Sequence, residues 1–354
     1  MLLMLLFAFS ALSVLYLSVF RREHETMSMP LTAPFHVHNI ETSSLALAAN
    51  SSCDLPRLQV LVLTANRPES LKRLLDSLVV AEYGCARVHL QVNVDLPQLA
   101  SEANLRCVEV AATFPWIHGR KTIHRRVSRA GLSQSWFEAP YMVGGREYIA
   151  IFEDDVQVSK HYFRFLNLVR HQGALDSYEI AALCLHPNDW EVETHLSCSA
   201  QFSPFLYLTP EPCNWGPIWK YDEWRQYIDW VFSAKAAGQL PYVENAYAYN
   251  YNKYLKDGKD VQSPWVWRYN YDFGKRHLRY SFRKCKGYSA SEMYFAINHK
   301  EPGEHFKRKL DLENDPALLD FDFSDVTDKF SSAENPFIPA PFPKYDTWAK
   351  SLKG

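Results

Sequence analysis

The sequence lacks the motifs of several large enzyme classes. It contains neither a Gly-x-Gly-x-x-Gly motif nor a P-loop, which argues against dinucleotide oxidoreductases and P-loop nucleoside triphosphatases. It also lacks the Gly-x-Ser-x-Gly elbow of α/β-hydrolases. Charge of one sign is not in excess, because 38 Lys and Arg residues oppose 40 Asp and Glu residues. The chain therefore has no electrostatic signature of a nucleic-acid partner.

The cysteines lack the spacing of a metal site. Seven are scattered along the chain: Cys53, Cys85, Cys107, Cys184, Cys198, Cys213 and Cys285. In an oxidising compartment some of them would form disulfides, and at least one thiol would remain unpaired. The alternative is that they are small, buried hydrophobic residues.

Charged residues are missing from the start of the chain, where Leu2 to Phe20 form an uncharged run of 19 residues. This length is just enough to span a bilayer, and no small-x-small cleavage site follows it. We therefore expect a transmembrane signal anchor over 1–20 rather than a cleaved signal peptide. The two arginines that follow would place the body in the cytoplasm by the positive-inside rule. A glycosylation acceptor at Asn50, in a stem over 21–56, favours a lumenal body instead.

Strands and helices alternate beyond the stem. Apolar runs predict strands at 58–64, 88–95 and 179–185, and helical spacing predicts helices over 69–80, 99–112 and 160–171. This alternation indicates a parallel sheet with helical crossovers. Further helices are expected at 132–138, 222–237 and 265–280. The basic segment from His118 to Arg129 is expected to be a solvated face, or alternatively to place one or two cations on a diphosphate.

Three consecutive acids follow a further buried strand that begins at Tyr148. Glu153, Asp154 and Asp155 have no basic residue among them. Crowded carboxylates need a compensating cation or hydrogen-bond donors, and ligands usually bind at the carboxyl ends of α/β strands. Oxygen ligands suit Mg²⁺ or Mn²⁺. The alternative is an acidic turn in which one Asp caps a helix.

The segment from Leu58 to Phe165 resembles nucleotide-sugar glycosyltransferases of the GT-A fold, and in particular the N-acetylglucosaminyltransferase I type. The resemblance depends on the opening Val60-Leu61-Val62-Leu63-Thr64-Ala65-Asn66-Arg67, on a second strand that ends in Asp95, and on Glu153-Asp154-Asp155 at the fourth strand of the pattern. The C-terminal half matches only loosely.

The resemblance implies a role for each acid of the motif. Asp155 would bind the metal, Asp154 would lie near the ribose, and Glu153 would lie near the donor sugar. The metal, Mn²⁺ or Mg²⁺, would act as a Lewis acid for the diphosphate of a UDP-sugar donor.

The resemblance also implies a nucleotide site at the ends of the first two strands. Arg67 would contact phosphate and Asp95 would bind uracil, while Thr64 and Asn66 would line the same pocket. The alternative for Arg67 is a surface charge at the start of a helix. The alternative for Asp95 is a turn-forming residue before Pro97.

The sequence departs from the resembled pattern where a catalytic base is expected. The segment 263–268 contains no acid, and Asp260 shortly before it is the candidate base. A retaining mechanism would dispense with a dedicated base, so the stereochemistry is open. His299, after an apolar strand-like run, is a candidate late metal ligand, and a hydrogen-bonded loop histidine is its alternative.

These features together predict an α/β protein of GT-A type, with a mostly parallel, Rossmann-like sheet flanked by helices. We expect a catalytic domain over 57–309, with a nucleotide-sugar half (57–185) and an acceptor half (186–309), and a tail over 310–354. The expected activity is hexosyl or N-acetylhexosaminyl transfer to a glycan or glycoprotein at a Golgi or other secretory-pathway membrane, with no nucleic-acid partner. The alternatives are a non-catalytic lumenal carbohydrate-binding protein on the same fold and a nucleotidyltransferase.

Overall fold

The computed structural model describes the core of the chain: residues 53–98, 101–138, 147–186, 204–243, 255–259, 261–282 and 295–298. The predicted anchor, nearly all of the stem, the C-terminal tail, and the candidates Asp260 and His299 lie outside the described residues. Within the described residues, no helix is both long and apolar enough to cross a membrane. The anchor therefore stays a prediction.

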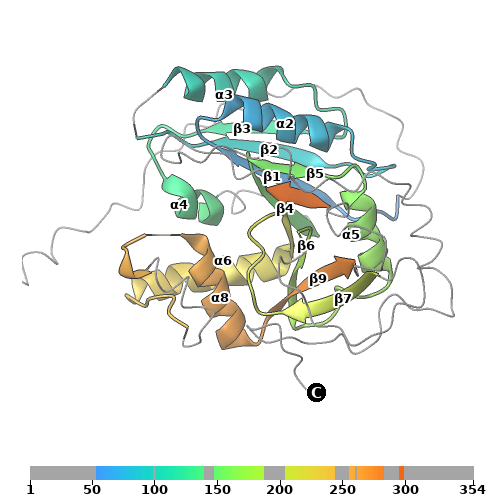
Figure 1. Cartoon of the computed structure of the whole chain (residues 1–354), viewed down its shortest axis with the longest axis vertical. Helices are drawn as coiled ribbons and strands as arrows, with labels where there is room; N and C mark the ends of the chain where they lie inside the picture. Colours follow the sequence, from blue (N-terminus) through green and yellow to red (C-terminus); the bar gives the residue numbers. More distant parts are fainter. Residues whose placement is uncertain are drawn as a thin grey trace, which may run out of the picture. The chain divides into compact units, whose positions relative to one another are not determined.

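One half of the main sheet is parallel (Figure 1). Its four strands are β1 (Leu58–Thr64), β2 (His89–Val94), β3 (Lys121–Arg125) and β4 (Tyr148–Glu153), in the order β3-β2-β1-β4. The register pairs Thr64 with Val94 and Leu63 with Glu153. The carboxyl ends of β1, β2 and β4 therefore meet at one edge of the sheet.

The other half of the sheet is mixed. It continues from β4 through β8 (Pro217–Lys220), β6 (Ile180–Cys184), β9 (Arg276–Phe282) and β7 (Pro204–Thr209). Only the β6–β9 pair is parallel there, while β4–β8, β8–β6 and β9–β7 are antiparallel. The expectation of a mostly parallel sheet is therefore correct for the first half only. A separate small sheet pairs β5 (Val156–Val158) with β10 (Ala296–Asn298).

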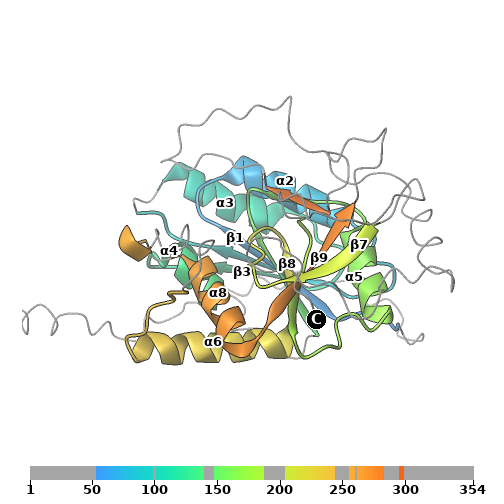
Figure 2. The same ribbon diagram turned by 60° about the horizontal axis from the view of Figure 1, so that its bottom comes forward.

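Helices cover both faces of the sheet (Figure 2). One hydrophobic core contains residues of α2 (Pro68–Val79), α3 (Glu102–Thr113) and α5 (Tyr162–His171), and a second contains residues of α4 (Gly131–Glu138), α6 (Tyr221–Ala236) and α8 (Gln262–Phe273). Alternate side chains of β1 pack in the two different cores, because successive side chains of a strand point to opposite faces. Val60 and Val62 belong to the first core, whereas Leu61 and Leu63 belong to the second.

The predicted helix over 265–280 is correct for its first half and wrong for the rest. Helix α8 ends at Phe273, and Gly274 follows with φ 63° in the left-handed region. Glycine adopts this conformation without steric cost and commonly ends helices. The chain then enters β9, which the sequence analysis did not anticipate. Strands β7 and β8 were likewise not predicted, because their proline- and aromatic-rich sequence shows no clear period.

The basic segment is only in part the solvated face that was expected: Arg120, Arg125 and Arg129 are exposed, whereas Lys121 and Ile123 of β3 are buried. Lys121 is buried, and its Nζ donates to the carbonyl oxygens of Ala111, Ala112 and Phe114 at 2.8, 2.9 and 2.6 Å. These carbonyls lie at the C-terminal end of α3, where the helix has no further backbone donors. A cation there also complements the helix dipole.

Candidate functional site

The acidic motif lies at the edge where the parallel strands end. Glu153 is the last residue of β4, and Asp154 and Asp155 form the turn before β5. The Asp154 N–H donates to the Leu63 carbonyl at 3.0 Å, which ties the turn to the end of β1. Asp154 is 1% exposed and Asp155 is 7% exposed. Buried carboxylates of this kind need compensating partners.

Arg67 supplies that compensation from the turn after β1. Its Nη1 donates to Asp155 Oδ2 at 3.0 Å, and its Nη2 pairs with Asp154 Oδ1. The Thr64 hydroxyl donates to the other oxygen of Asp154 at 2.7 Å. Burial would lower the pKa of Arg67, but attraction by Asp154 and Asp155 outweighs it and raises that pKa. The structure therefore brings together four of the residues predicted for the site.

Glu153 faces the opposite side of the sheet end. Its Oε1 accepts a hydrogen bond from Trp136 Nε1 of α4 at 3.0 Å. Burial raises the pKa of Glu153 to about 8, with a further contribution from the charge of Asp155, while Trp136 and Arg67 oppose the rise. Burial also raises the pKa of Asp154 to about 6, and here Arg67 is the main opposing group. At Glu153 and Asp154, burial and the charges of neighbouring carboxylates therefore favour the neutral form.

Asp95 follows β2, as predicted, but its carboxylate has backbone partners. Its two oxygens accept hydrogen bonds from the N–H groups of Ala130 and Gly131 at 2.9 and 2.8 Å. These residues lie at the start of α4. These contacts are with the start of α4 and not with the turn at Pro97, so they do not bear out the turn-forming alternative. The uracil contact stays a prediction.

Asn66 is half-buried in the turn between β1 and α2, next to Arg67. Among the described residues no contact of Asn66 tests its predicted place in a nucleotide pocket, so that role stays a prediction. A further buried carboxylate, Glu223, lies in the first turn of α6. Glu223 is buried and accepts hydrogen bonds from Lys275 Nζ at 2.8 Å and from the Tyr269 hydroxyl at 2.6 Å. This paired carboxylate joins α6 to α8 and to the residue before β9, which indicates a structural role.

The donor set at the acidic turn fits a hard divalent cation only in part. Asp154 and Asp155 offer carboxylate oxygens, which Mg²⁺ and Mn²⁺ prefer. Within the described part of the chain, however, no group of three or more His, Cys, Asp and Glu side chains could enclose a metal. A cation held by Asp155 would therefore need oxygen ligands from a bound molecule, as a diphosphate provides.

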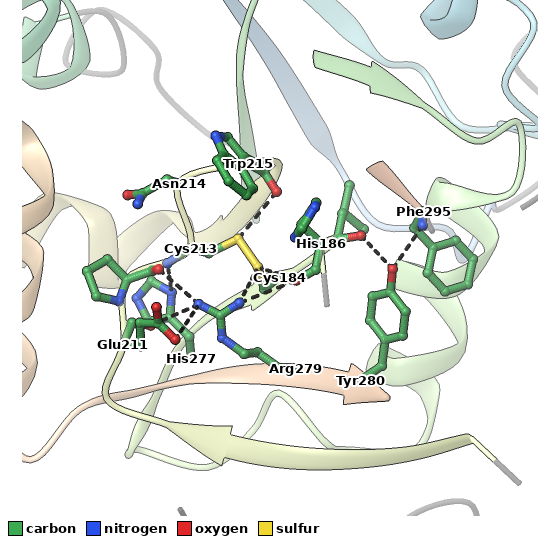
Figure 3. Close-up of a disulfide and its surroundings, with 12 residues drawn as sticks. Cys184, His186, Glu211, Cys213, Asn214, Trp215, His277, Arg279, Tyr280 and Phe295 are labelled. Carbon is green, nitrogen blue, oxygen red and sulfur yellow. Dashed lines mark hydrogen bonds and ion pairs between the residues drawn. A yellow bond between two sulfur atoms is a disulfide. The ribbon is translucent and has the colours of Figure 1, made fainter. Parts of the chain in front are cut away.

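A polar cluster in the C-terminal half was not predicted from the sequence (Figure 3). Cys184, at the end of β6, forms a disulfide with Cys213. Arg279 of β9 donates to the carbonyl oxygens of His186 at 3.3 Å and of Pro212 at 2.9 Å. His277 Nδ1 accepts the Cys213 N–H at 3.0 Å. The signal that could have found this cluster is the pair of polar residues at alternate positions of β9, His277 and Arg279, which points to a strand with a buried polar face.

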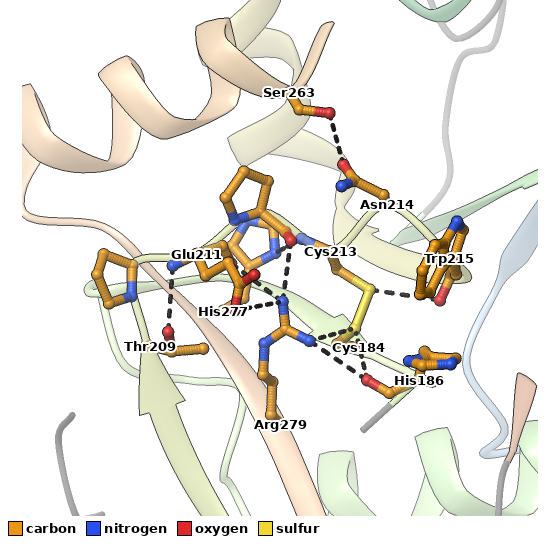
Figure 4. Close-up of polar contacts among 12 residues, drawn as sticks. Cys184, His186, Thr209, Glu211, Cys213, Asn214, Trp215, Ser263, His277 and Arg279 are labelled. Carbon is orange, nitrogen blue, oxygen red and sulfur yellow. Dashed lines mark hydrogen bonds and ion pairs between the residues drawn. A yellow bond between two sulfur atoms is a disulfide. The ribbon is translucent and has the colours of Figure 1, made fainter. Parts of the chain in front are cut away.

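The same cluster reaches α8 through Asn214 (Figure 4). Its Oδ1 accepts a hydrogen bond from the Ser263 hydroxyl at 2.7 Å, in the first turn of the helix. A second disulfide, Cys53–Cys85, ties the start of the described chain to the segment before β2. Cys107 is a buried free thiol. The expectation that some cysteines pair is therefore confirmed.

Comparisons with known proteins give only distant structural likenesses. No family model and no curated protein matches the sequence. One similar solved structure is that of S. aureus TarS, which is 15% identical in sequence and gives a TM-score of 0.34. The match covers 48% of this chain and 29% of the TarS chain. Another is the mannosyltransferase PcManGT from Pyrobaculum calidifontis in complex with GDP-Man and Mn²⁺, with 16% identity, coverages of 61% and 53%, and a TM-score of 0.36. The match thus spans about half or less of those chains, and likenesses this distant do not assign a function.

Proposed function

We propose that this chain is a metal-dependent glycosyltransferase that moves a sugar from a UDP-sugar donor to a hydroxyl group of a glycan or glycoprotein. The observation that carries the proposal is the meeting of Arg67, Thr64, Asp154 and Asp155 where β1 and β4 end. Two buried carboxylates and one partly exposed guanidinium suit a ligand that brings both a metal and phosphate oxygens. The GT-A resemblance of the sequence supports the same assignment.

The site chemistry fits the breaking of a glycosidic bond to a diphosphate. A divalent cation held by Asp155 would stabilise the negative charge that develops on the leaving diphosphate. Arg67 can add to this stabilisation, because a guanidinium matches phosphate geometry and stays charged. Glu153, on the other side of the strand end, would lie near the donor sugar.

Arg67 and a metal would compete for Asp155. In this structure the guanidinium bridges Asp154 and Asp155, so it already supplies the positive charge that those carboxylates need. A cation that binds Asp155 would weaken that ion pair. Arg67 would then be available to phosphate oxygens while Thr64 continues to hold Asp154. We expect metal and nucleotide to bind more tightly together than separately.

His299 remains the proposed late metal ligand. The register of the small sheet supports it, because Asn298 pairs with Val156 and Val156 directly follows Asp155. The described chain therefore approaches the acidic turn one residue before His299. Asp260 remains the proposed base, with inversion and retention both open.

We also propose a lumenal position in the secretory pathway, with residues 1–20 as a single-pass anchor. Two disulfides among the described cysteines support it, because such bonds persist in oxidising compartments. The apolar N-terminal run and the glycosylation acceptor at Asn50 support it further.

A donor-hydrolysis assay tests the proposed function. Purified full-length protein is incubated with Mn²⁺ and a panel of nucleotide sugars, and the released nucleotide is identified by mass spectrometry. We expect UDP from at least one UDP-sugar and none after chelation with EDTA. Binding without release would favour the non-catalytic carbohydrate-binding alternative. Formation of a nucleotide sugar and pyrophosphate from a nucleoside triphosphate and a sugar phosphate would favour the nucleotidyltransferase alternative.

A further inference from the structure

Helix α4 lies between two residues of the candidate site. Asp95, at the end of β2, contacts its first residues, and Glu153, at the end of β4, contacts Trp136 in its last turn. The helix is short, with eight residues, and isolated helices of that length are unstable in water. Its position must therefore be fixed by contacts with the rest of the fold.

Asp95 fixes the start of the helix. One carboxylate accepts two successive backbone N–H groups, those of Ala130 and Gly131, which would otherwise lack partners within the helix. Gly131 has φ 78°, so this entry to the helix needs a residue without a Cβ. Negative charge is also favourable at a helix N-terminus. The Asn104 side chain in turn donates to the Asp95 carbonyl oxygen at 2.8 Å, so the backbone that carries the carboxylate is itself held.

The far end of α4 fixes Glu153. Trp136 is 2% exposed, and Phe137 beside it is fully buried in the second hydrophobic core. A large indole packed in this way has few alternative rotamers available, so its N–H points in a defined direction. Arg126 Nη2 lies 2.6 Å from Glu138 Oε2, and this ion pair further anchors the last turn of α4.

We infer that Asp95 and Trp136 are positioning residues that act as one unit on Glu153, with Asp95 acting through α4 rather than by contact with the base of the nucleotide. The inference rests on the proposed function, in which Glu153 lies near the donor sugar. It assigns α4 to orientation of the sugar-facing carboxylate, and it leaves nucleotide and metal binding to Arg67, Thr64 and Asp155.

The test compares Asp95→Asn, Trp136→Phe and the double variant in full-length protein. Each single change should lower kcat for UDP-sugar turnover about tenfold and leave the Kd for UDP with Mn²⁺ within twofold of wild type. The double variant should be no more than twofold slower than Trp136→Phe, because both changes release the same carboxylate. Leu132→Ala is the matched control, since this side chain of α4 is 45% exposed and should change neither quantity more than twofold.

Amide hydrogen exchange gives a readout that does not depend on activity. Asp95→Asn should raise the exchange rates of α4 at least tenfold while leaving those of β1 unchanged. Unchanged exchange in α4 would overturn the inference. A tenfold loss of UDP affinity together with additive effects on kcat would also overturn it, because it would show that Asp95 contacts the uracil of the nucleotide. If wild-type protein neither binds UDP nor turns over a donor, the proposed function fails, and exchange still decides whether Asp95 holds α4.

Discussion

Arg67 and Arg279 are both guanidinium groups drawn into the fold, but they bind different kinds of partner. The Arg279 side chain is 4% exposed and donates mainly to backbone carbonyl oxygens beside the Cys184–Cys213 disulfide (Figure 4). The Arg67 side chain is 23% exposed, and its described partners are the carboxylates of Asp154 and Asp155. Backbone carbonyls stay in place, whereas carboxylates can bind a metal instead. The comparison separates a structural cluster from one suited to ligand exchange.

The largest effect should come from the carboxylate proposed to hold the metal. Asp155→Asn removes the negative charge but keeps the shape of the side chain. The rate of sugar transfer should therefore fall roughly a thousandfold, which corresponds to a loss of about 4 kcal/mol of transition-state stabilisation. The melting temperature should stay near that of wild type, because burial of an amide is no more costly than burial of a charge. Steady-state transfer and calorimetry on the same preparation check this. A variant with most of its activity in Mn²⁺ would remove Asp155 from the metal site.

The C-terminal cluster should respond in stability rather than in chemistry. Cys184→Ser with Cys213→Ser should lower the free energy of unfolding by about 3 kcal/mol. The matched control is the same double change at Cys53 and Cys85, which closes a loop of similar length, with sequence separations of 32 and 29. Chain entropy alone predicts equal losses, so a larger loss at Cys184–Cys213 measures the contribution of its buried surroundings. Denaturant titrations decide it, and a smaller loss there would contradict the structural role.

His277 makes the same cluster sensitive to acid. Burial lowers its pKa to about 3 from an ordinary value of 6.5, and its Nδ1 accepts the Cys213 N–H. The unfolded chain therefore binds a proton below pH 6.5 that the folded chain does not bind until about pH 3, so stability is lost as the pH falls through that window. The loss is roughly 2 kcal/mol at pH 5. Denaturant titrations at pH 7 and pH 5 should show a smaller drop for His277→Asn than for wild type. Equal drops would show that His277 is not buried in its neutral form.

A smaller effect is expected at Arg67. Arg67→Gln should weaken UDP binding in the presence of Mn²⁺ about tenfold, or about 1.4 kcal/mol, because a charged hydrogen bond to phosphate is lost. The same variant should bind Mn²⁺ alone more tightly than wild type, since Asp155 no longer has a competing cation. Arg67→Lys is the control, because it keeps the charge but cannot bridge both carboxylates in the same way. Calorimetric titration of Mn²⁺ without nucleotide tests the exchange, and identical affinities in wild type and Arg67→Gln would contradict it.

The smallest effect is expected at the proposed late ligand. His299→Ala should raise the Mn²⁺ concentration needed for UDP binding about threefold to tenfold, because one of several ligands is lost. His305→Ala, further along the chain, is the control and should have little effect. Titration of Mn²⁺ at fixed UDP distinguishes them, and a curve for His299→Ala that matches wild type would remove His299 from the site.

The two halves of the chain also differ in how well sequence alone predicts them. In the parallel half, β1, α2, β2 and β4 follow from apolar periodicity, and α2 begins at Pro68, one residue before the predicted start. The positions of Arg67, Asp154 and Asp155 follow too, because parallel strands place their carboxyl ends at one edge of the sheet. Local pattern and global fold agree there.

Elsewhere, long-range contacts decide the structure and local patterns do not reveal them. Strand β9 buries His277 and Arg279, whose partners lie far away in the sequence, so it lacks the continuous apolar run of an ordinary buried strand. The contact of Asp95 with α4 likewise joins residues 35 and 36 positions apart. Carboxylates after a strand predict a site, but they do not say which of them the fold itself uses.

The central claim is that the acidic turn binds a nucleotide diphosphate together with a metal. Its most direct test is calorimetric titration of UDP into wild-type protein with Mn²⁺ and again with EDTA, with ADP as the control nucleotide. The account predicts binding of UDP that is at least tenfold tighter with Mn²⁺ than with EDTA, and weaker binding of ADP under both conditions. Equal affinity for UDP with Mn²⁺ and with EDTA, or no binding of UDP at all, would contradict it.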